Sequence, residues 1–550
     1  MKTCAYDYIV VGGGAAGCVI AARLSEDSEK TVLMLEQGPH DRAASIRING
    51  AYFRTMGTKR TVQYFTEPQP YTNNRPIQVM QANTLGGGHS INAMVYIRGQ
   101  RDDYDGWRDA GCAGWGYDEV LPYFRKAENN QRLVNEFHGN SGPLVVSDSN
   151  YRHILSGAFV DAAREAGTGF GVDLQVNDDF NGEFQKGVGY YQISSRNGER
   201  CSTARGYLRS AKGRWNLSVR TDTRVLRIII ENGRATGVVI GDAQGVETRI
   251  DAREEVIVAA GTITSPKLLM LSGIGNALEL EPLGITVHSN LPGVGENYQD
   301  HLVAPVDGEL LRPISLLGQD HGLKALGHGL NWLLFRRGLL SSNQVEAGGF
   351  LDLDGDGRPE IQLHALAMAS TSWGKLETGE QVHGYSVAPC CLTSYSRGTI
   401  RLRSADPAEP PIIAANYLKD DRDLRNLIRG VRFARQILKA PSFARHVKGE
   451  IMPGAQFGDD DASLERYVRN HVQMAFHPAG TCAMGNDARA VVNTRLKVYG
   501  IKGLRVADAS IMPTLVRGNT TAPVVMIAER AAEFIKEDAA ARRNLQCRAA

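Results

Sequence analysis

Short apolar runs alternate along the chain with longer segments in which apolar residues recur every three or four positions. The runs at 225–230 and 256–259 have the length of buried strands, whereas 117–127 and 154–166 have the spacing of amphipathic helices. Alternation of strand-like and helix-like segments predicts an α/β architecture.

The pattern changes between about 310 and 465, where apolar and polar residues alternate in short runs. Residues 399–403 read Thr-Ile-Arg-Leu-Arg, and loops rich in Gly, Pro and Asp separate such runs. A period of two predicts a separate, antiparallel layer. The chain has no internal repeat, and the tail after Ala539 lacks an apolar pattern, so we expect that tail to fray.

Composition narrows the class of protein. The 550 residues are 42% hydrophobic and 22% charged, which is enough apolar material for a large core. Lys and Arg number 62 against 60 Asp and Glu, a net charge of +2, which argues against nucleic acid as a partner and against a protein held on anionic membranes. No apolar run reaches the roughly 18 residues of a transmembrane segment. Strand-like sequence begins by Tyr8, leaving no room for a signal peptide, so a cytoplasmic location is expected.

Cysteines and acidic residues give no metal or disulfide signature. The eight cysteines lack CxxC spacing, which argues against a disulfide framework, a zinc site or covalent haem. Because neighbours on a strand point to opposite faces, we expect one of Cys390 and Cys391 to be buried and no functional disulfide between them. The stretch beginning at Asp352 resembles the opening of a calcium loop, but its twelfth position is Leu363 instead of Glu. A solvated turn leading into a strand at 361–365 is therefore favoured.

The N-terminus carries a dinucleotide fingerprint. An apolar strand runs into Gly12-x-Gly14-x-x-Gly17, and a helix-forming stretch and a second strand ending at Glu36 follow. Gly12 permits the turn, Gly14 lets a pyrophosphate approach the backbone, and Gly17 lets the helix pack on the strand. Glu36 is placed to accept hydrogen bonds from a ribose. The motif leaves NAD and FAD open, although its extreme N-terminal position in a long chain is common among flavoproteins.

Five further segments complete an ordered series of motifs. Residues 84–92 read Thr-Leu-Gly-Gly-Gly-His-Ser-Ile-Asn, and 261–275 begin Gly-Thr-Ile-Thr-Ser-Pro. Residues 293–301 end in Asp-His, 477–485 begin His-Pro-Ala-Gly, and 507–513 begin Ala-Asp-Ala-Ser. Together with the fingerprint, these resemble the signatures of the glucose–methanol–choline (GMC) oxidoreductases, and they are most similar to the bacterial choline-dehydrogenase-like branch. The likeness covers nearly the whole chain.

The resemblance implies a Rossmann-like FAD-binding domain and a second, substrate domain built on an antiparallel sheet over the isoalloxazine ring. We expect the FAD-binding domain to be discontinuous, with 1–155 joined by 200–310 and 466–550. The substrate domain would then comprise 156–199 and 311–465, which agrees with the change of pattern near 310–465.

The fingerprint and the resemblance together nominate a set of cofactor-binding residues: Gly12, Gly14, Ala15, Ala16, Gly17, Glu36, Gly86, Gly87, Asn92, Met94, Val225, Asp508, Asn519 and Thr520. Some relatives attach FAD covalently through a histidine immediately before the asparagine of the 84–92 loop. That position is Ile91 here, so non-covalent FAD is predicted. His89, two residues earlier, is interpreted as a hydrogen-bonded loop histidine in preference to a flavin link.

The resemblance also implies a catalytic pair. His477 matches the family's active-site histidine, and a neutral imidazole is suited to remove the hydroxyl proton of an alcohol. Asn519 occupies the position that is His or Asn in relatives, where it would hold the substrate oxygen; its alternative role is to cap the helix that we expect from Pro523 to Ile535. The positive end of that helix would face the flavin pyrimidine. His471 has no motif support and is expected to pack or cap locally.

These observations predict an FAD-dependent oxidation of a primary alcohol to an aldehyde, with hydride transfer to flavin N5. An uncharged aliphatic or aromatic alcohol is weakly favoured over choline. The acceptor, O2 or an electron carrier, and the oligomeric state are left open. The alternatives within the family are a non-redox lyase, a photodecarboxylase, whose members place a cysteine near the position of Cys390, and a flavin-bound scaffold without turnover.

Overall fold

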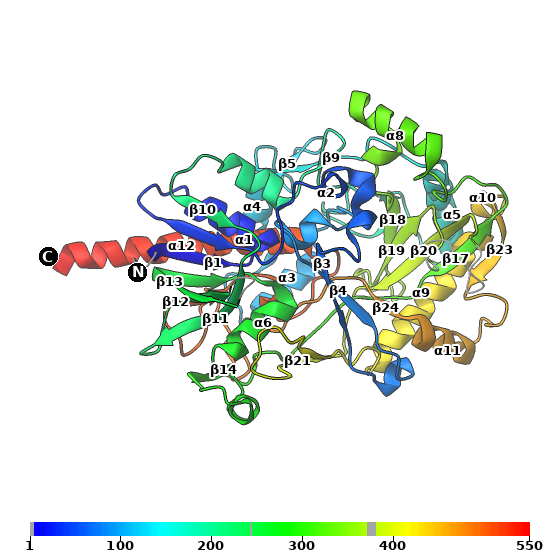
Figure 1. Ribbon diagram of the computed structural model, residues 1–550. Helices are drawn as coiled ribbons and strands as arrows, with labels where there is room; N and C mark the ends of the chain where they lie inside the picture. The colour runs from blue at the N-terminus through cyan, green and yellow to red at the C-terminus, as the bar shows by residue number, and fades with distance from the viewer. Residues whose placement is uncertain (1–4, 242–244, 371–380, 550) are drawn as a thin grey trace.

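The computed structural model describes residues 5–241, 245–370 and 381–549, and it contains two large sheets at opposite ends of the molecule (Figure 1). One sheet has seven strands in the order β10-β2-β1-β13-β12-β11, with β25 added beside β13. Its strands are β1 (Ala5–Val11), β2 (Val32–Leu35), β10 (Leu217–Arg220), β11 (Arg224–Glu231), β12 (Arg234–Gly241), β13 (Glu247–Val258) and β25 (Leu504–Val506).

The centre of this first sheet is parallel. Strand β1 pairs in parallel with β2 and with β13, and β25 also runs parallel to β13. The residues of β2 are all buried, as expected of parallel strands covered on both faces. Helices α1 (Ala15–Leu24) and α12 (Thr521–Ala549) pack against each other beside β1 (Figure 1). The sequence prediction for α12 was wrong at its end, because the helix continues through the tail that was expected to fray.

The second sheet has eight strands, all paired antiparallel, in the order β23-β17-β20-β19-β18-β7. Strand β16 also pairs with β20, and β24 pairs with β16. Its strands are β7 (Gly187–Tyr190), β16 (Leu302–Val303), β17 (Val306–Leu310), β18 (Ala347–Leu351), β19 (Ile361–Leu366), β20 (Gly384–Cys391), β23 (Val447–Met452) and β24 (Gln473–Met474). The layer expected between 310 and 465 is thus an antiparallel sheet, and it also recruits β16, β17 and β24 from flanking segments.

Helix α9 (Asp421–Lys439) crosses the second sheet against β20. Its N-terminus is capped by Asp420, whose side chain accepts a hydrogen bond from the backbone N–H of Arg422. The surrounding helices on this side are α5 (Ile154–Gly169), α10 (Pro441–Ala444) and α11 (Asp461–His471). The apolar face of α9 supplies much of the core beneath the sheet.

Smaller elements link the two halves. The two-stranded pairs are β3 (Thr61–Phe65) with β4 (Gln78–Ala82), β5 (Glu128–Asn130) with β6 (Leu144–Val146), β8 (Ser195–Arg196) with β9 (Glu199–Arg200), β14 (Ile274–Gly275) with β15 (Ser289–Asn290), and β21 (Thr399–Arg401) with β22 (Ile412–Ala414). The remaining helices are α2 (Ala44–Arg47), α3 (Arg101–Asp109), α4 (Tyr117–Ala127), α6 (Gly261–Leu271), α7 (Ala277–Leu280) and α8 (Gly322–Phe335). Short helical turns of use below are η1 (Asn49–Thr55), η3 (Gly87–Ser90), η6 (Leu339–Ser341) and η8 (Ala509–Ile511). Within the described ranges, no helix combines the length and apolar character needed to cross a bilayer.

Several local interpretations can be compared with the structure. Asp352 forms the expected turn, because its carboxylate accepts hydrogen bonds from the backbone N–H groups of Gly355 and Gly357. His471 packs locally, with its ring stacked on Tyr467 at 4.6 Å between centroids. The expectation that only one of the paired cysteines of β20 would be buried was wrong, since α9 and neighbouring strands cover both.

Candidate active site

A cavity of about 580 Å³ lies between the two sheets. One end is formed by the turn after β1 and by the carboxyl end of β2, and the other by β16, β19, β20 and the segment that follows β24. The carboxyl ends of parallel strands are where ligands bind in open α/β sheets. The cavity therefore joins a dinucleotide-type turn to the antiparallel layer.

The glycines of the fingerprint are required by close backbone contacts. Gly12 has φ +101°, and a Cβ there would lie 2.4 Å from the carbonyl oxygen of Ala259. A Cβ on Gly17 would lie 1.9 Å from the carbonyl oxygen of Gly12, so this glycine lets α1 pack on the strand. Gly14 faces the cavity, and a Cβ there would lie 3.8 Å from the carbonyl oxygen of Ala259, an ordinary contact distance. The turn is shaped to admit a ligand at Gly14.

Glu36 closes this end of the cavity. Its carboxylate accepts hydrogen bonds from the backbone N–H of Gly13 at 2.8 Å and of Gly38 at 2.7 Å. Burial raises the pKa of the Glu36 carboxyl above its usual range, although both backbone hydrogen bonds act in the opposite direction. The two oxygens keep lone pairs on the cavity side, where a ribose hydroxyl could donate.

The loop around η3 brings a second set of predicted residues to the cavity. Gly87, at φ +55°, approaches the fingerprint so closely that a Cβ would lie 2.8 Å from the Cα of Gly14. Arg200 is buried behind this loop and donates to the side-chain oxygen of Asn92 at 2.8 Å and to its carbonyl oxygen at 2.7 Å. Asn92 in turn donates to the hydroxyl of Thr521 at 3.1 Å, which ties the loop to the start of α12.

The interpretation of His89 as a hydrogen-bonded loop histidine was wrong. His89 lines the cavity and is 1% exposed, and neither ring nitrogen has a hydrogen-bond partner among the described residues. Burial and the neighbouring Arg200 guanidinium lower the pKa of His89 to about 3, so the ring is neutral. A buried unpartnered imidazole is costly unless something supplies a partner. Ile91 lines the same wall and offers no atom for a covalent link.

His477 stands at the opposite end of the cavity, immediately after Phe476, whose φ of +62° turns the chain. The backbone N–H of His477 donates to Asp300 at 2.9 Å. Its ring lies between two partners: Nδ1 is 3.0 Å from Nδ1 of His301, and Nε2 is 3.1 Å from Nδ2 of Asn519. Both ring nitrogens are thus held in fixed directions.

The orientation of Asn519 is set by a third residue. Gln362 on β19 donates from Nε2 to Oδ1 of Asn519 at 3.1 Å, which leaves the amide N–H₂ of Asn519 facing His477. Nε2 of His477 is therefore the acceptor, unprotonated nitrogen, and Nδ1 carries the proton that is shared with His301. Helix α12 begins at Thr521, and the backbone N–H of Val524 bonds to Thr520, so Asn519 is not the capping residue.

Electrostatics keep this imidazole neutral. Burial, followed by the neighbouring His301 and His364, lowers the pKa of His477 well below its usual value of 6.5. Burial likewise lowers the pKa of His301 to about 3 and that of His364 to about 4. Two neutral histidines, His364 and His477, thus line this end of the cavity, and His301 supports the His477 ring. His477 can accept a proton from a bound ligand.

The structure brings together most of the residues nominated from the sequence. Those that line the cavity are Gly12, Gly14, Ala15, Ala16, Glu36, Gly87, Asn92, Met94, Val225, His477, Asp508, Asn519 and Thr520. Gly17 and Gly86 lie outside the lining. Gly17 packs under the turn, and Gly86, at φ +87°, donates its backbone N–H to the carbonyl oxygen of Gly13.

Sequence reasoning missed four residues around this cavity. Arg200 carries no signal of its own. His301 ends the 293–301 motif, but nothing in the sequence places it beside His477, since both contacts join segments distant in the chain. Gln362 and His364 had a usable signal, because alternate residues of the expected strand 361–365 share one face of the sheet. On that face, His364 lines the cavity and Gln362 contacts Asn519.

Charge is unevenly distributed along the cavity. Among the described residues that line it, the only carboxylates are Glu36 and Asp508, and none is a lysine or arginine. The Asp508 carboxylate is occupied by the backbone N–H of Gly261 at 2.9 Å and the hydroxyl of Ser265 at 2.6 Å. The lining at the His477 end is apolar or neutral and includes Val303, Val345, Ala388 and Phe476.

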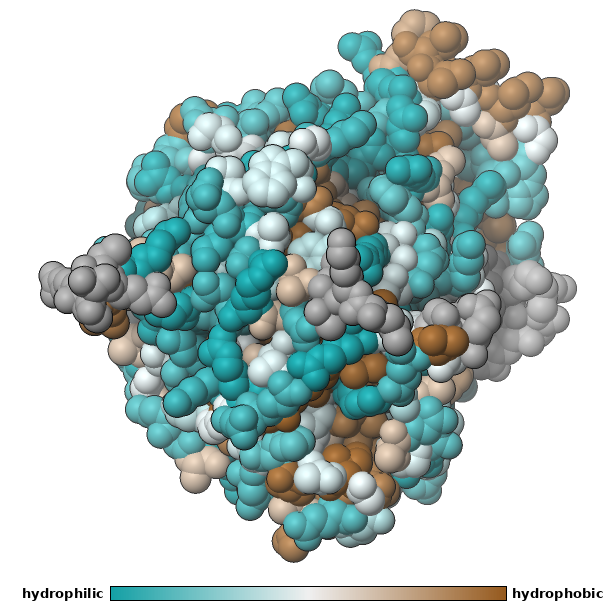
Figure 2. Space-filling model, turned by 60° about the vertical axis from the view of Figure 1, so that its left-hand side comes forward, coloured by the Kyte–Doolittle hydropathy of each residue, from teal (hydrophilic) through white to brown (hydrophobic). Residues whose placement is uncertain are grey.

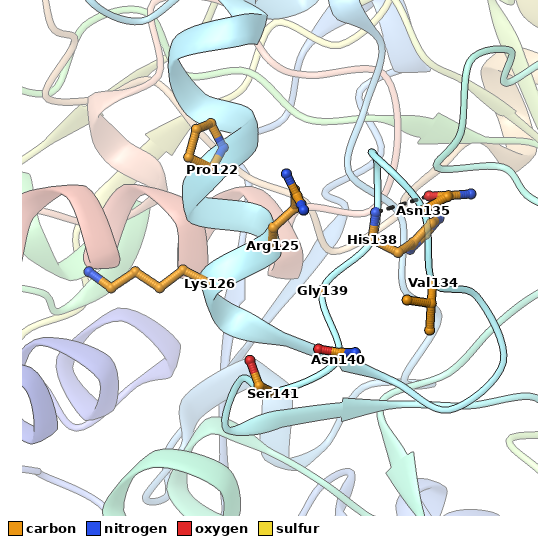
Figure 3. A pocket seen from close by; sticks show the side chains of 9 residues that line it. All are labelled: Pro122, Arg125, Lys126, Val134, Asn135, His138, Gly139, Asn140 and Ser141. Atoms are coloured by element: carbon orange, nitrogen blue, oxygen red, sulfur yellow. Dashed lines mark hydrogen bonds between the residues drawn. The ribbon is translucent and has the colours of Figure 1, made fainter.

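A second cavity, of about 530 Å³, lies between α4 and the loop 134–141 (Figure 3). Arg125 and Lys126 of α4 border it together with His138, and none of the residues nominated from the sequence does. The His138 ring is engaged with Glu128 at 3.1 Å and Asp179 at 3.0 Å. We assign this cavity no part in the chemistry.

Comparison with known proteins gives a consistent result. Family models described as GMC oxidoreductase match residues 6–303 and 394–528. The chain is 40% identical to an alcohol dehydrogenase (acceptor) from Pseudomonas putida over 539 residues, which cover 96% of this chain and 95% of that protein. It is also 40% identical to oxygen-dependent choline dehydrogenase 1 from Chromohalobacter salexigens over 540 residues, with the same coverage.

Solved structures show the same fold. A pyridoxine 4-oxidase from Mesorbium loti superposes with a TM-score of 0.85 at 29% identity, covering 96% of this chain and 98% of that one. A formate oxidase variant from Aspergillus oryzae RIB40 superposes with a TM-score of 0.89 at 27% identity, covering 98% and 99%. The chain belongs to the GMC oxidoreductase family.

Proposed function

We propose that this protein oxidises a primary alcohol to an aldehyde with FAD, using His477 as the base and Asn519 as the residue that positions the substrate oxygen. One observation carries the proposal: the His477–Asn519 pair opens onto the same cavity as the dinucleotide fingerprint. The alcohol dehydrogenase and choline dehydrogenase relatives support the same reaction class.

The cavity fits FAD. Glu36 would accept from the adenosine ribose, Gly14 and Gly87 would admit the pyrophosphate, and Asn92 and His89 would meet the polar edge of the isoalloxazine. When bound, FAD supplies the N5 atom that accepts the substrate hydride. Because Ile91 occupies the linking position, we propose that FAD is held without a covalent bond.

The protein's own residues handle the proton. Nε2 of His477, kept unprotonated by burial and oriented by Asn519, takes the hydroxyl proton of the alcohol. The N–H₂ of Asn519 donates to the oxygen from which the proton departs and so stabilises the charge that develops there. His301 holds the ring from the opposite side at Nδ1, which keeps Nε2 aimed into the cavity.

The apolar, carboxylate-free end of the cavity points to an uncharged alcohol as substrate. A quaternary ammonium group would enter this end without a counter-charge among the described lining residues, which is costly in a buried site. Val303, Val345 and Phe476 offer an apolar chain a surface on which to pack. We therefore propose an aliphatic or aromatic primary alcohol, although several relatives carry the name choline dehydrogenase.

An anaerobic absorbance titration tests the reaction. The yellow protein should bleach on addition of an uncharged primary alcohol, and admission of air should then distinguish an oxidase, which recolours rapidly, from a dehydrogenase that needs another acceptor. If no alcohol in a broad panel bleached the bound FAD, the result would contradict the proposal. Light-dependent release of CO₂ from a fatty acid would instead indicate the photodecarboxylase alternative, and cyanohydrin cleavage the lyase.

Acid precipitation tests the mode of FAD attachment. Denatured protein should form a colourless pellet and leave free FAD in the supernatant. A pellet that stays yellow would show a covalent link, and peptide mapping would then identify the attachment residue, with His89 as the first position to examine because it lines the same wall as Ile91.

A further inference from the structure

The outer face of α8 is a row of leucines that no other described part of the chain covers. Leu323, Leu326, Leu330, Leu333 and Leu334 are between 49% and 86% exposed. Figure 1 shows α8 standing out from the body at the end that holds the antiparallel sheet, and Figure 2 shows apolar side chains gathered at that corner. We call these five residues the leucine row.

The leucine row points away from the protein. Its spacing along the chain, successive steps of three, four, three and one residues, confines it to about 100° of the helix circumference. Trp332 lies on the opposite side of the helix, buried, with its indole N–H donating to the carbonyl oxygen of Gly198 at 2.8 Å. A surface helix usually turns its apolar stripe to the core, and this one turns it to the outside, which marks an interaction surface.

Basic residues lie at both ends of α8. The helix contains no Asp or Glu, Lys324 is exposed in its first turn, and Arg336 and Arg337 follow its last turn. Arg337 is exposed and has no ion-pair partner among the described residues, whereas Arg336 lies over the Trp332 ring at 4.0 Å. The neighbouring acid, Asp320, is paired with His321 at 2.6 Å. An exposed apolar stripe on a helix with cations at both ends and no acid of its own complements an anionic lipid surface.

We propose that α8 docks this protein on an anionic phospholipid bilayer, with the leucine row among the acyl chains and Lys324 and Arg337 against the headgroups. The fourteen residues of α8 span about 21 Å, less than the roughly 30 Å of a hydrocarbon core, so the helix would lie along the surface. A single protruding helix also offers less area than the roughly 800 Å² per partner of a stable protein interface, which favours lipid over a second copy of the chain.

The docking helix is connected to the wall of the active-site cavity. Turn η6 follows α8 closely, and the side chain of Asn49 in η1 donates to the carbonyl oxygen of Ser341 in η6 at 2.9 Å. Tyr52 of η1 and the adjacent Met56 line the cavity. A protein docked through α8 would therefore hold this wall close to the bilayer, where uncharged alcohols with apolar chains accumulate; this consequence alone rests on the proposed function.

Vesicle flotation of the FAD-loaded protein tests the docking. The wild type should float with phosphatidylcholine vesicles that contain about 30% phosphatidylglycerol and less with phosphatidylcholine alone. A triple variant, Leu326→Asp, Leu330→Asp and Leu333→Asp, should float at least about tenfold less. Leu278→Asp is the matched control, since Leu278 is 82% exposed on α7, and it should float like the wild type.

Two further measurements separate lipid docking from self-association and from a general loss of activity. Lys324→Gln with Arg337→Gln should weaken flotation on anionic vesicles, as should about 0.5 M salt. Reduction of bound FAD by a short, water-soluble alcohol should be the same in all these variants, so a failure of docking is distinct from a failure of the proposed reaction.

The proposal is overturned if the wild type does not float on anionic vesicles, or if the triple variant floats equally well. Light scattering that shows a wild-type dimer, broken in the triple variant, together with no flotation, would assign the row to a second copy.

Discussion

His477 owes its chemical state to the residues around its ring. Asn519 and His301 fix the two nitrogens, and burial keeps the imidazole neutral. Replacing His477 with Ala should leave FAD bound and slow its reduction by alcohol by at least about a hundredfold, because a positioned base contributes about 10²–10⁴-fold. Stopped-flow absorbance under anaerobic conditions measures this rate.

The control for His477→Ala is His471→Ala, which removes a histidine that packs on Tyr467 away from the cavity. That variant should reduce its FAD at close to the wild-type rate. If His477→Ala also reduced at nearly the wild-type rate, the base would have to be another group, and His364 would be the next candidate in the cavity.

The lowered pKa of His477 predicts an unusual pH profile. A base works when unprotonated, so a histidine with the usual pKa of 6.5 would lose about tenfold in rate between pH 7.5 and 5.5. Because burial, His301 and His364 lower the pKa of His477, the rate of FAD reduction at saturating alcohol should change little over this range. The prediction covers pH 5.5 to 7.5 only. Burial raises the pKa of Asp300 to about 8, and this carboxyl accepts a hydrogen bond from the backbone N–H of His477, so its own ionisation would affect the rate at higher pH.

A profile that falls with an apparent pKa near 6.5 would show that His477 is solvated during turnover. Repeating the measurement in deuterated buffer would reveal whether the proton removed from the alcohol contributes to the observed rate. The same profile in Asn519→Ala should shift or weaken, since that variant loses the donor to Nε2.

Of the residues around the active-site cavity, the sequence predicted those that belong to recognisable motifs. It missed those that reach the site only because the chain folds. The fingerprint glycines, Asn92 and His477 stand in motifs and line the cavity, apart from Gly17 beneath the turn. Arg200 holds Asn92 from 108 positions away, and no local pattern could reveal it. His301 closes a motif, yet its contact with the His477 ring spans 176 positions.

At the scale of elements, α1 and α12 are joined by a buried acid. Glu529 is fully buried on α12 and accepts hydrogen bonds from Arg23 of α1, from 2.7 to 3.0 Å, and from the hydroxyl of Tyr207 at 2.7 Å. Lys126 of α4 lies 3.3 Å away. This one carboxylate on α12 therefore connects α12 with three other segments, α1, the turn that holds Tyr207, and α4.

Replacing Glu529 with Ala should lower the free energy of unfolding by about 3 kcal/mol, because the largely buried Arg23 guanidinium then keeps only the more exposed Glu26 as a partner. Glu533→Ala is the matched control, since its carboxylate is 42% exposed and 3.6 Å from Lys126, and it should cost less than about 1 kcal/mol. Chemical denaturation monitored by circular dichroism compares the two. Equal losses in both variants would contradict a special role for the buried acid.

Helix ends and strand partners were the least predictable elements. The period of apolar residues located α4 and α5 well, and the alternating pattern located β19. Helix α12 continues through the tail after Ala539, where Arg542 binds Glu254 and Glu255 and Arg543 binds Asp27, tertiary contacts that the apolar period does not contain. The strands β16 and β24 have two residues each, too few for any pattern.

At the scale of the whole molecule, net charge proved a coarse guide. The value of +2 argued against an anionic membrane as partner, yet the segment 320–337 alone carries three basic residues against one acidic residue beside the leucine row. The docking proposal rests on the local arrangement of charged and apolar side chains on α8, which the net charge of the whole chain does not reveal. Charge is also uneven inside the active-site cavity, where both described carboxylates, Glu36 and Asp508, lie away from the His477 end.

That internal separation of charge makes a sharp prediction about substrate choice. Choline and 3,3-dimethylbutan-1-ol have nearly the same shape and differ in one positive charge, so together they isolate the electrostatic contribution. Because the described lining near His477 holds no carboxylate, the uncharged alcohol should react with a kcat/KM at least about a hundredfold higher, equivalent to roughly 2.7 kcal/mol in the transition state. Steady-state assays with an artificial acceptor measure both. A preference for choline would mean that a carboxylate reaches the cavity in the working enzyme, and would place this protein with the choline-oxidising relatives in substrate as well as in family.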